Sequence, residues 1–352
     1  MKKSVFKALQ IISLTAGLLL FAYLIRQVGI EALSQYLGAM GWGFALIVAL
    51  SFLRNCARAA SWYFSIEPSH RRIGYWPLMN VMLAGEAIKY LTATGPLLGE
   101  PAKAAMVRRE VPLIQGFSSI VVENLIYNLT VFFFMIAGLS TLVWVTDVPG
   151  RLQLGACIFA AAIMFAALFT WLAIRGRWYV LARMLEQVGQ LLGRNNKREA
   201  VGGNGRLASM IRRVREVEEN IYLFYEQRRV AFLLIFAVNI AAHLINIVEI
   251  YVILALMGWP GALSSAFVIE AVTKVINGAF FFVPTRAGVY ESGNALVLKS
   301  LGMEASAGVA LAIIRKLRAF IWIGYGLIVI LLQTLKDRRS QELPARAGAA
   351  EK

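Results

Sequence analysis

Residues 230–257 read VAFLLIFAVNIAAHLINIVEIYVILALM, and Glu249 is the one charged side chain in this stretch. A helix needs about 20 mostly apolar residues to cross the hydrocarbon core of a bilayer, so the stretch predicts a transmembrane helix. The whole 352-residue chain shares this character, because 59% of its residues are hydrophobic and only 16% are charged. A soluble domain has about 25% charged residues. The sequence therefore predicts an all-α polytopic membrane protein, with no soluble domain large enough to be a separate enzyme.

Apolar stretches of this length recur along the chain. Those that predict full crossings lie at roughly 8–25, 37–64, 113–145, 151–174, 230–257 and 305–335. The first shows no small-residue cleavage site and predicts a span, not a signal peptide. Two further stretches, 77–109 and 262–301, carry Glu, Lys, Gly and Pro in their middles. Each predicts a re-entrant hairpin or a pair of broken half-helices, so that six full crossings and two interrupted segments give about eight membrane segments.

Lysine and arginine are distributed unevenly between these segments. Twelve of them lie in 175–229, and others cluster at both ends of the chain. Because basic loops stay on the cytoplasmic side, both termini are predicted to be cytoplasmic, and the two interrupted stretches to enter from opposite sides. The net charge of +16 then reflects orientation and contact with anionic lipid headgroups, and no nucleic-acid partner is predicted.

Four regions follow from this layout. The polar region after the fourth crossing has apolar residues at helical spacing, which predicts either amphipathic helices on the cytoplasmic membrane surface or a solvated linker. The polar stretch after Asp337 predicts a disordered cytoplasmic tail. The regions are an N-terminal membrane half at 1–175, a linker at 176–229, a C-terminal membrane half at 230–336 and the tail at 337–352.

The two interrupted stretches resemble each other. The first reads GEAIKYLTATGPLLGEPAK at 85–103, and the second reads IEAVTKVINGAFFFVPTRAGVYESG at 269–293. Both contain Glu-Ala, Lys, Gly, Pro, Gly and Glu in this order, with different spacings. One interpretation is an inverted repeat, a common transporter plan in which the substrate site lies between the repeats. The other is that Gly and Pro simply mark helix ends.

Charged side chains inside membrane segments cost about 3 kcal/mol or more, so each needs a partner or a function. Three pairs of opposite charge have helical spacing: Glu86 with Lys89, Glu100 with Lys103, and Glu270 with Lys274. Members of such a pair share a helix face and can neutralise each other. The pairs therefore predict either structural ion pairs or contacts to a lipid headgroup.

Two predicted crossings also carry polar stripes. They are Glu123, Asn124, Tyr127 and Asn128 on the third, and Asn239, His243, Asn246 and Glu249 on the fifth. For Asn239 and Asn246 the spacing favours ordinary hydrogen bonds between helices. A lone carboxylate is harder to bury, so Glu123 and Glu249 favour a functional role.

The densest cluster of helix-breaking and charged residues is Pro284, Arg286, Gly288 and Glu291. A guanidinium group there could meet a phosphate with two parallel hydrogen bonds. Arg315 and Arg318 share a face inside the last predicted crossing, so they are further candidates for contact with an anionic headgroup. Arg54 and Arg58 fall near the end of the second crossing and serve here only as orientation signals.

The sequence lacks the residues that several classes of function require. The chain has two histidines, His70 and His243, and two cysteines, Cys56 and Cys157, so no metal site, disulfide or cofactor is predicted. The GGNG stretch at 202–205 lacks the Lys-Ser/Thr ending of a phosphate-binding loop, and no GxSxG nucleophile elbow occurs. We therefore do not expect an ATP-driven pump within this chain.

Three stretches together resemble the lysylphosphatidylglycerol synthase transmembrane-region family, whose members are flippase-like membrane proteins. They read GYWPLMNVMLAGEAIKYLTATGPLLGEPAKAAMVRRE at 74–110, SSIVVENLIYNL at 118–129 and FFVPTRAGVYESG at 281–293. The resemblance covers about residues 8–335. The motif positions that match are Gly95, Pro96, Gly99, Glu100 and Lys103 in the first half, and Pro284, Gly288 and Glu291 in the second. Arg286 departs from the family pattern, where a small residue is expected, which leaves the headgroup preference open.

The resemblance implies about eight membrane segments and a role in lipid translocation or lipid binding. Bifunctional members join the flippase domain to a cytoplasmic aminoacyl-lipid synthase domain. That domain is absent from this sequence, so the resemblance argues against aminoacyl transfer. Related stand-alone members are described as lipid transporters, some of them linked to hopanoid or glycolipid pathways.

The predicted function is that of a flippase, not an enzyme, which moves a polar-headgroup lipid across the bacterial cytoplasmic membrane. Two alternatives stay open: a membrane-embedded lipid-modifying enzyme, and a non-transporting partner of a lipid or glycan synthase. The predicted ligands are membrane lipids, anionic or glycosylated, and the oligomeric state is left open. The predicted headgroup contacts are Glu86, Lys89, Glu100, Lys103, Glu123, Asn128, Glu270, Lys274, Pro284, Arg286, Glu291, Arg315 and Arg318.

Overall fold

The computed structural model describes residues 38, 40–92, 95–145, 150–192, 206–259, 262–279 and 289–350. Regular structure in these ranges is helical throughout, as the sequence predicts, and they contain no strand. Apart from one 3₁₀ turn, Pro68–His70, the helices are α3 (Gly43–Ser65), α4 (Tyr75–Leu91), α5 (Pro96–Met106), α6 (Leu113–Val145), α7 (Gly150–Arg175), α8 (Val180–Leu192), α10 (Arg206–Gln227), α11 (Arg229–Leu256), α12 (Leu263–Ala279), α13 (Val289–Ser300) and α14 (Ala305–Ala350).

Four of the described helices are long and apolar enough to cross a membrane, namely α3, α6, α11 and α14. They coincide with four of the predicted crossings. Helix α7 occupies a fifth, and its apolar part counts as a span only together with α8, from which it is bent by 88°. The described part of the chain therefore holds four or five candidate spans, fewer than the six predicted full crossings. The predicted crossing at 8–25 lies outside the described residues.

Helices α3 and α6 run in opposite directions. Trp62 on α3 donates a hydrogen bond to Ser119 on α6. Arg58, one turn before Trp62, pairs with Glu123, one turn after Ser119. The end of α3 and the beginning of α6 therefore lie at the same end of the bundle. Residues 66–112, which contain α4 and α5, leave from that end and return to it. This first interrupted segment is thus a hairpin.

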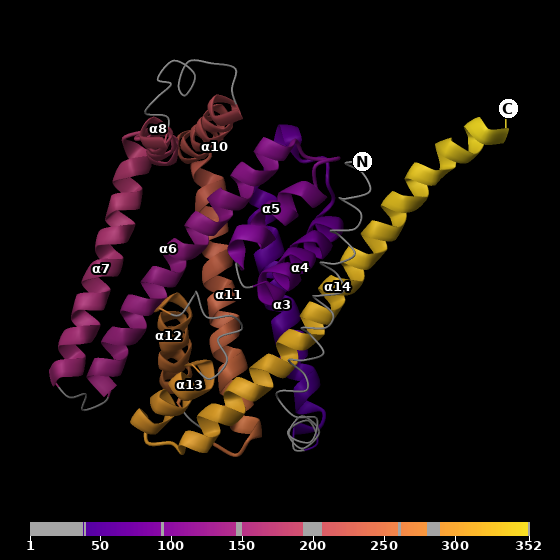
Figure 1. The fold of residues 1–352 in the computed structure, drawn as a ribbon. Coiled ribbons are helices and arrows are strands. Elements are labelled where there is room, and N and C mark those ends of the chain that lie inside the picture. Colours follow the sequence, from indigo (N-terminus) through magenta and orange to yellow (C-terminus); the bar gives the residue numbers. More distant parts are fainter. Residues whose placement is uncertain are drawn as a thin grey trace.

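The second interrupted segment starts from the other end of the bundle. The last turn of α11 contacts the first residue of α3, because Leu256 packs against Gly43. The first turns of α14 join the same apolar cluster, in which Ala307 and Leu311 pack with Ile47 and Leu254. Residues 257–304, with α12 and α13, therefore begin and end opposite to α4 and α5. Figure 1 shows α12 and α13 at the end of the bundle opposite to α8 and α10.

Glycines set the shape of the first hairpin. The turn between α4 and α5 contains Gly95 with a φ of +46°, a backbone conformation that glycine adopts at little cost. A methyl group on Gly85 would lie 2.3 Å from Cγ of Lys103, and one on Gly99 would lie 3.0 Å from Cβ of Lys89. The two arms therefore approach closely only because these positions have no side chain, and this approach brings their charged residues together.

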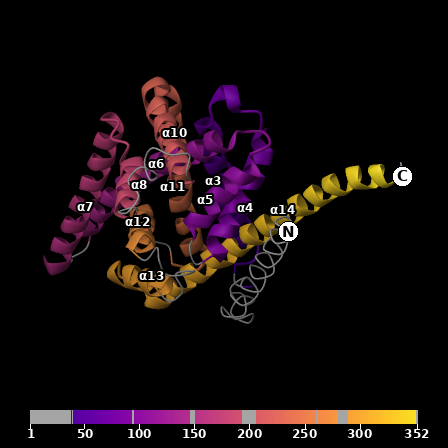
Figure 2. The same ribbon diagram turned by 45° about the horizontal axis from the view of Figure 1, so that its top comes forward.

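Helix α14 crosses the bundle at a slant and packs along α4 (Figures 1 and 2). At the crossing point a methyl group on Gly326 would lie 2.5 Å from the carbonyl oxygen of Leu83. Helix α14 then continues to Ala350, where the sequence predicts a disordered tail over 337–352. Alanine, arginine, glutamine and glutamate dominate that stretch, and all four have high helix propensity.

The linker region forms two helices, α8 and α10, which cap one end of the bundle (Figure 1). Glu218 on α10 accepts hydrogen bonds from the backbone N–H groups of Leu181 and Ala182, which caps the N-terminus of α8. Helix α10 packs against α6 through an apolar cluster that includes Ile221 and Phe224. Both stretches with apolar residues at helical spacing are helical, and the GGNG stretch lies outside the described residues.

Candidate functional site

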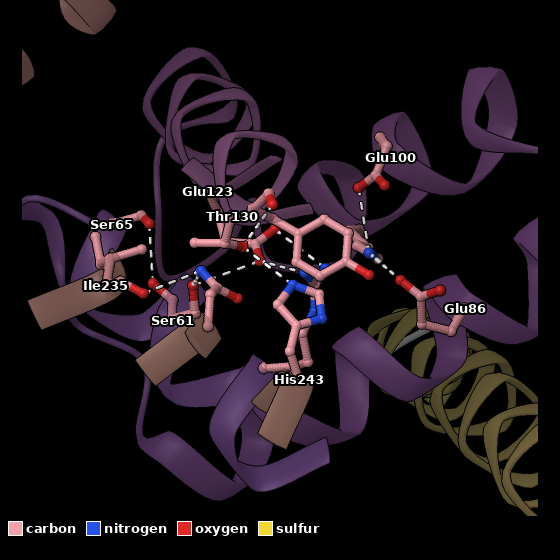
Figure 3. Close-up of polar contacts among 12 residues, drawn as sticks. Ser61, Ser65, Glu86, Glu100, Glu123, Thr130, Ile235 and His243 are labelled. Carbon is pink, nitrogen blue, oxygen red and sulfur yellow. Dashed lines mark hydrogen bonds and ion pairs between the residues drawn. The ribbon is translucent and has the colours of Figure 1, made fainter. Parts of the chain in front are cut away.

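A buried ion pair joins α3 to α6 in the middle of the bundle. Nη1 of Arg58 lies 3.1 Å from Oε1 of Glu123, whose side chain is 5% exposed. Ser61, one turn after Arg58, donates to the same carboxylate over 3.4 Å, and it accepts a hydrogen bond from Asn239 on α11. Figure 3 shows Glu123, Ser61 and His243 gathered in one region. Three helices are thus held together by one carboxylate and its neighbours.

The two arms of the first hairpin hold a ring of four alternating charges. Nζ of Lys103 lies 2.7 Å from Glu86 and 3.2 Å from Glu100. Nζ of Lys89 lies 3.0 Å from Glu86 and 2.8 Å from Glu100. In Figure 3 dashed lines run from the carboxylates of Glu86 and Glu100 toward the same place between them. The members of the ring differ in burial: the Glu86 side chain is 42% exposed and the Lys103 side chain only 4%.

Tyr127 on α6 links the N-terminal half of the network to the C-terminal half. The guanidinium carbon of Arg58 lies 3.8 Å from the centre of the Tyr127 ring, a cation–π contact. On its other side Lys274 donates to the Tyr127 hydroxyl over 3.3 Å, and it also pairs with Glu270 over 3.0 Å. Glu270 accepts a second ion pair from Arg315 on α14, again over 3.0 Å. The sequence predicts the Glu270–Lys274 pair but not these bridges to other helices.

Helix α14 forms two further ion pairs. Arg318 pairs with the buried Glu249 on α11, and Lys316 pairs with Glu291 on α13. Arg54 on α3 donates a hydrogen bond to Asn246 on α11 over 3.4 Å and another to its neighbour Asn55 over 3.0 Å. The polar stripe that the sequence indicates on the fifth crossing therefore faces the interior. Asn239 makes the interhelical hydrogen bond that its spacing favours, and Glu249 forms an ion pair.

The structure brings most of the predicted site residues into one connected region. The members of this charge network among them are Glu86, Lys89, Glu100, Lys103, Glu123, Glu270, Lys274, Arg315 and Arg318, and Glu291, which forms an ion pair of its own with Lys316. Asn128 is exposed on α6 and no hydrogen bond joins it to the described part of the network. Pro284 and Arg286 lie outside the described residues.

Arg54 and Arg58 are the members that sequence reasoning missed as site residues. The sequence places both near the end of a span, where basic residues mark the cytoplasmic side. In the structure they lie four residues apart on one face of α3 and point toward α6 and α11. Their spacing and their position within an apolar stretch were the available signals, because charges inside a span face protein or a cavity.

The network holds more positive than negative side chains. Its basic members are Arg54, Arg58, Lys89, Lys103, Lys274, Arg315, Lys316 and Arg318, and its acidic members are Glu86, Glu100, Glu123, Glu249, Glu270 and Glu291. Buried ions are retained only when they are paired or used, because desolvation costs several kcal/mol for each ion. Within the described residues no group of three or more His, Cys, Asp and Glu side chains could hold a metal ion.

Comparison with known proteins identifies the family of this chain. Neither the curated proteins nor the solved structures contain a significant match to the chain. The sequence model of the lysylphosphatidylglycerol synthase TM region matches residues 10–326, which include every member of the charge network. The apolar helices and this match make the chain an integral membrane protein with a link to lipid synthesis or transport. The chain belongs to the lysylphosphatidylglycerol synthase TM-region family.

Proposed function

We propose that the protein is a lipid transporter, and not an enzyme, which moves a lipid with a polar headgroup across the cytoplasmic membrane of a bacterium. Both termini would lie on the cytoplasmic side, where the basic linker helices α8 and α10 also belong under the positive-inside rule. The observation that carries the proposal is the charge network, since it lies among membrane-spanning helices and between two hairpins that start from opposite ends of the bundle.

The energetics of the network favour a transport role. A structural core of apolar residues would be at least as stable as buried ion pairs, so the network contributes little that packing could not supply. Lys89 and Lys103 each pair with two carboxylates. Each lysine can therefore exchange one carboxylate for a headgroup and still keep the other.

The two hairpins support the proposal through their arrangement. Many transporters consist of two halves of inverted topology, and their substrates bind near the mid-plane, where broken helices meet. Here α4–α5 and α12–α13 are broken segments that start from opposite ends, and the contacts of Tyr127 with Arg58 and Lys274 join α3, α6 and α12 between them. We propose that the halves are such a repeat and that the headgroup passes along this connection while the acyl chains stay in the bilayer.

Reconstitution of the purified protein into liposomes tests the proposal. Fluorescent lipids with several headgroups would be placed in both leaflets, and dithionite would quench the outer leaflet. A protein-dependent loss of the protected inner signal for one headgroup class would support lipid transport. Absence of loss for every headgroup, with and without a proton gradient, would contradict it, provided that insertion is verified.

Lipid analysis of a deletion strain separates transport from lipid modification. A transporter predicts that its lipid is chemically unchanged and accumulates in one leaflet, whereas an enzyme predicts that a lipid product disappears. Mass spectrometry of total lipids, combined with leaflet-selective labelling of headgroup amines or oxidation of headgroup diols, reads both quantities in one experiment.

A further inference from the structure

The excess of positive charge lies around α14, where Arg54 of α3 adds to the cations of the C-terminal half. The charge ring of the first hairpin is balanced, and Arg58 is balanced by Glu123. Around α14, by contrast, Lys274, Arg315, Arg318 and Arg54 face only two carboxylates, Glu249 and Glu270. An excess of buried positive charge is costly unless an anion compensates it.

Arg54, Arg315 and Arg318 lie on α3 and α14, and both helices contact α11. Arg54 contacts Asn246 on α11, and Glu249, one turn further along α11, pairs with Arg318 on α14. Arg315 lies one turn before Arg318 on α14 and pairs with Glu270 on α12. A hydrogen bond from Trp322 on α14 to Ser51 on α3 holds these two helices together one turn away, over 2.7 Å.

Several buried donors in this set have no partner among the described residues. They are Nε and Nη1 of Arg315, Nε of Arg318 and Nδ2 of Asn55. Arg315 and Arg318 are only 7% and 6% exposed, so bulk water does not satisfy these groups. An unpaired buried donor costs about 1–3 kcal/mol, and more when it is charged. Within the described part of the chain, an acceptor with negative charge would satisfy several of these donors at once.

We propose that this set, the arginine site of Arg54, Arg315 and Arg318, binds a phosphate group. A guanidinium presents its N–H donors in a planar fork that matches phosphate oxygens, whereas a lysine presents a point charge. One phosphate group supplies both the missing charge and several acceptor oxygens. Oε2 of Glu249 is an acceptor without a partner in the same set, and a hydroxyl group next to the phosphate would satisfy it.

This inference rests on the proposed lipid transport for its biological setting, but not for its test. A phosphate group could belong to a lipid headgroup or to free inorganic phosphate. Delipidated full-length protein in detergent would be titrated with a short-chain phosphatidic acid, with the uncharged diacylglycerol of the same chains, and with inorganic phosphate. Isothermal titration calorimetry would give the three affinities.

The wild-type protein is expected to bind phosphatidic acid at least tenfold more tightly than the diacylglycerol. If inorganic phosphate competes with phosphatidic acid, the site recognises the phosphate group itself, and the ratio of the two affinities tells whether the lipid or the free ion is its natural ligand. Equal affinity for the charged and the uncharged lipid would overturn the proposal.

Variants of the arginine site sharpen the test. Arg54→Gln breaks no ion pair of the described residues, because the hydrogen bonds of Arg54 go to the amide groups of Asn246 and Asn55. It should weaken binding of phosphatidic acid about tenfold while diacylglycerol binding stays the same. Arg54→Lys should restore part of the affinity. The double variant Glu249→Gln/Arg318→Gln removes a whole ion pair and should weaken phosphate binding in the same selective way. Arg212→Gln, on the exposed face of α10, is the matched control for loss of one positive charge.

Two outcomes separate this site from the proposed function. Transport of an uncharged lipid that is insensitive to Arg54→Gln would leave the function standing and refute the phosphate site. Selective phosphate binding that depends on Arg54, in a protein that transports none of the lipids tested, would support the site and contradict the function.

Discussion

The guanidinium group of Arg58 lies on the ring of Tyr127, 3.8 Å from its centre, and the hydroxyl group of the same tyrosine receives a hydrogen bond from Lys274. One aromatic side chain thus contacts a cation from the N-terminal half and a cation from the C-terminal half. The two halves of the chain are connected electrostatically at this point, in the middle of α6.

Replacement of Tyr127 tests that connection. Tyr127→Phe keeps the ring face for Arg58 and removes only the hydroxyl partner of Lys274, whereas Tyr127→Leu removes both contacts. We expect the leucine variant to be less stable than the phenylalanine variant by about 1–2 kcal/mol, which is the range of a desolvated cation–π contact. Denaturant unfolding in detergent micelles measures the difference. Equal stability of the two variants would show that the ring contact contributes nothing.

The Arg58–Glu123 pair predicts a strongly non-additive result. Glu123→Leu alone leaves a buried guanidinium without its carboxylate and is expected to cost about 3–5 kcal/mol. The double variant Arg58→Met/Glu123→Leu replaces the pair by apolar groups and should recover most of that loss. A complete double-mutant cycle, read by the free energy of unfolding, checks this. Costs that simply add would mean that the two side chains do not interact.

Because the two hairpin arms approach closely, we expect a single methyl group added at Gly85 to impair transport. Gly85→Ala places Cβ 2.3 Å from Cγ of Lys103, so Lys103 must move and its two ion pairs must lengthen. We expect transport to fall severalfold, with a smaller loss of thermal stability. Gly278→Ala is the control, because open space surrounds that position on α12. A wild-type rate in the Gly85 variant would show that the position of Lys103 does not matter for transport.

The exposed apolar face of α8 predicts contact with the membrane surface. Leu181, Met184 and Val188 lie on one face and are all exposed, and α8 lies at 88° to α7, as a helix parallel to the membrane would. A nitroxide label at Met184→Cys should be more accessible to oxygen, which partitions into lipid, than to a water-soluble nickel complex. A label at Arg183→Cys should show the reverse. Similar accessibility at both positions would favour a solvated linker.

The fold was largely predictable from the sequence. The apolar stretches at 113–145 and 230–257 coincide with α6 and α11 to within one residue, and the stretch at 305–335 predicts where α14 begins but not its end at Ala350. The Gly95-Pro96 pair indicates the break between α4 and α5. The helical tail was not predictable in the same way, because its polar composition is compatible with a helix as well as with disorder.

The site was predictable as a set of residues but not as a network. Spacing identified the pairs within one helix, such as Glu86 with Lys89, since residues three or four apart share a face. It could not show that Lys89 also reaches Glu100, because this contact depends on the approach of two arms at Gly85 and Gly99. Nor could it show which face of α3 is inside, so Arg58 was missed until its partners on α6 were known.

Transport by a single-site network variant tests the central claim most directly. The liposome assay would compare wild-type protein with Glu100→Gln, which removes one member of the charge ring, and with Glu110→Gln, which removes an exposed carboxylate outside it. Circular dichroism and thermal unfolding would confirm that all three proteins are folded. We predict that Glu100→Gln loses lipid translocation and that Glu110→Gln keeps it. A folded Glu100→Gln protein that translocates lipid at the wild-type rate would contradict the assignment of the buried charge network as the route of the headgroup.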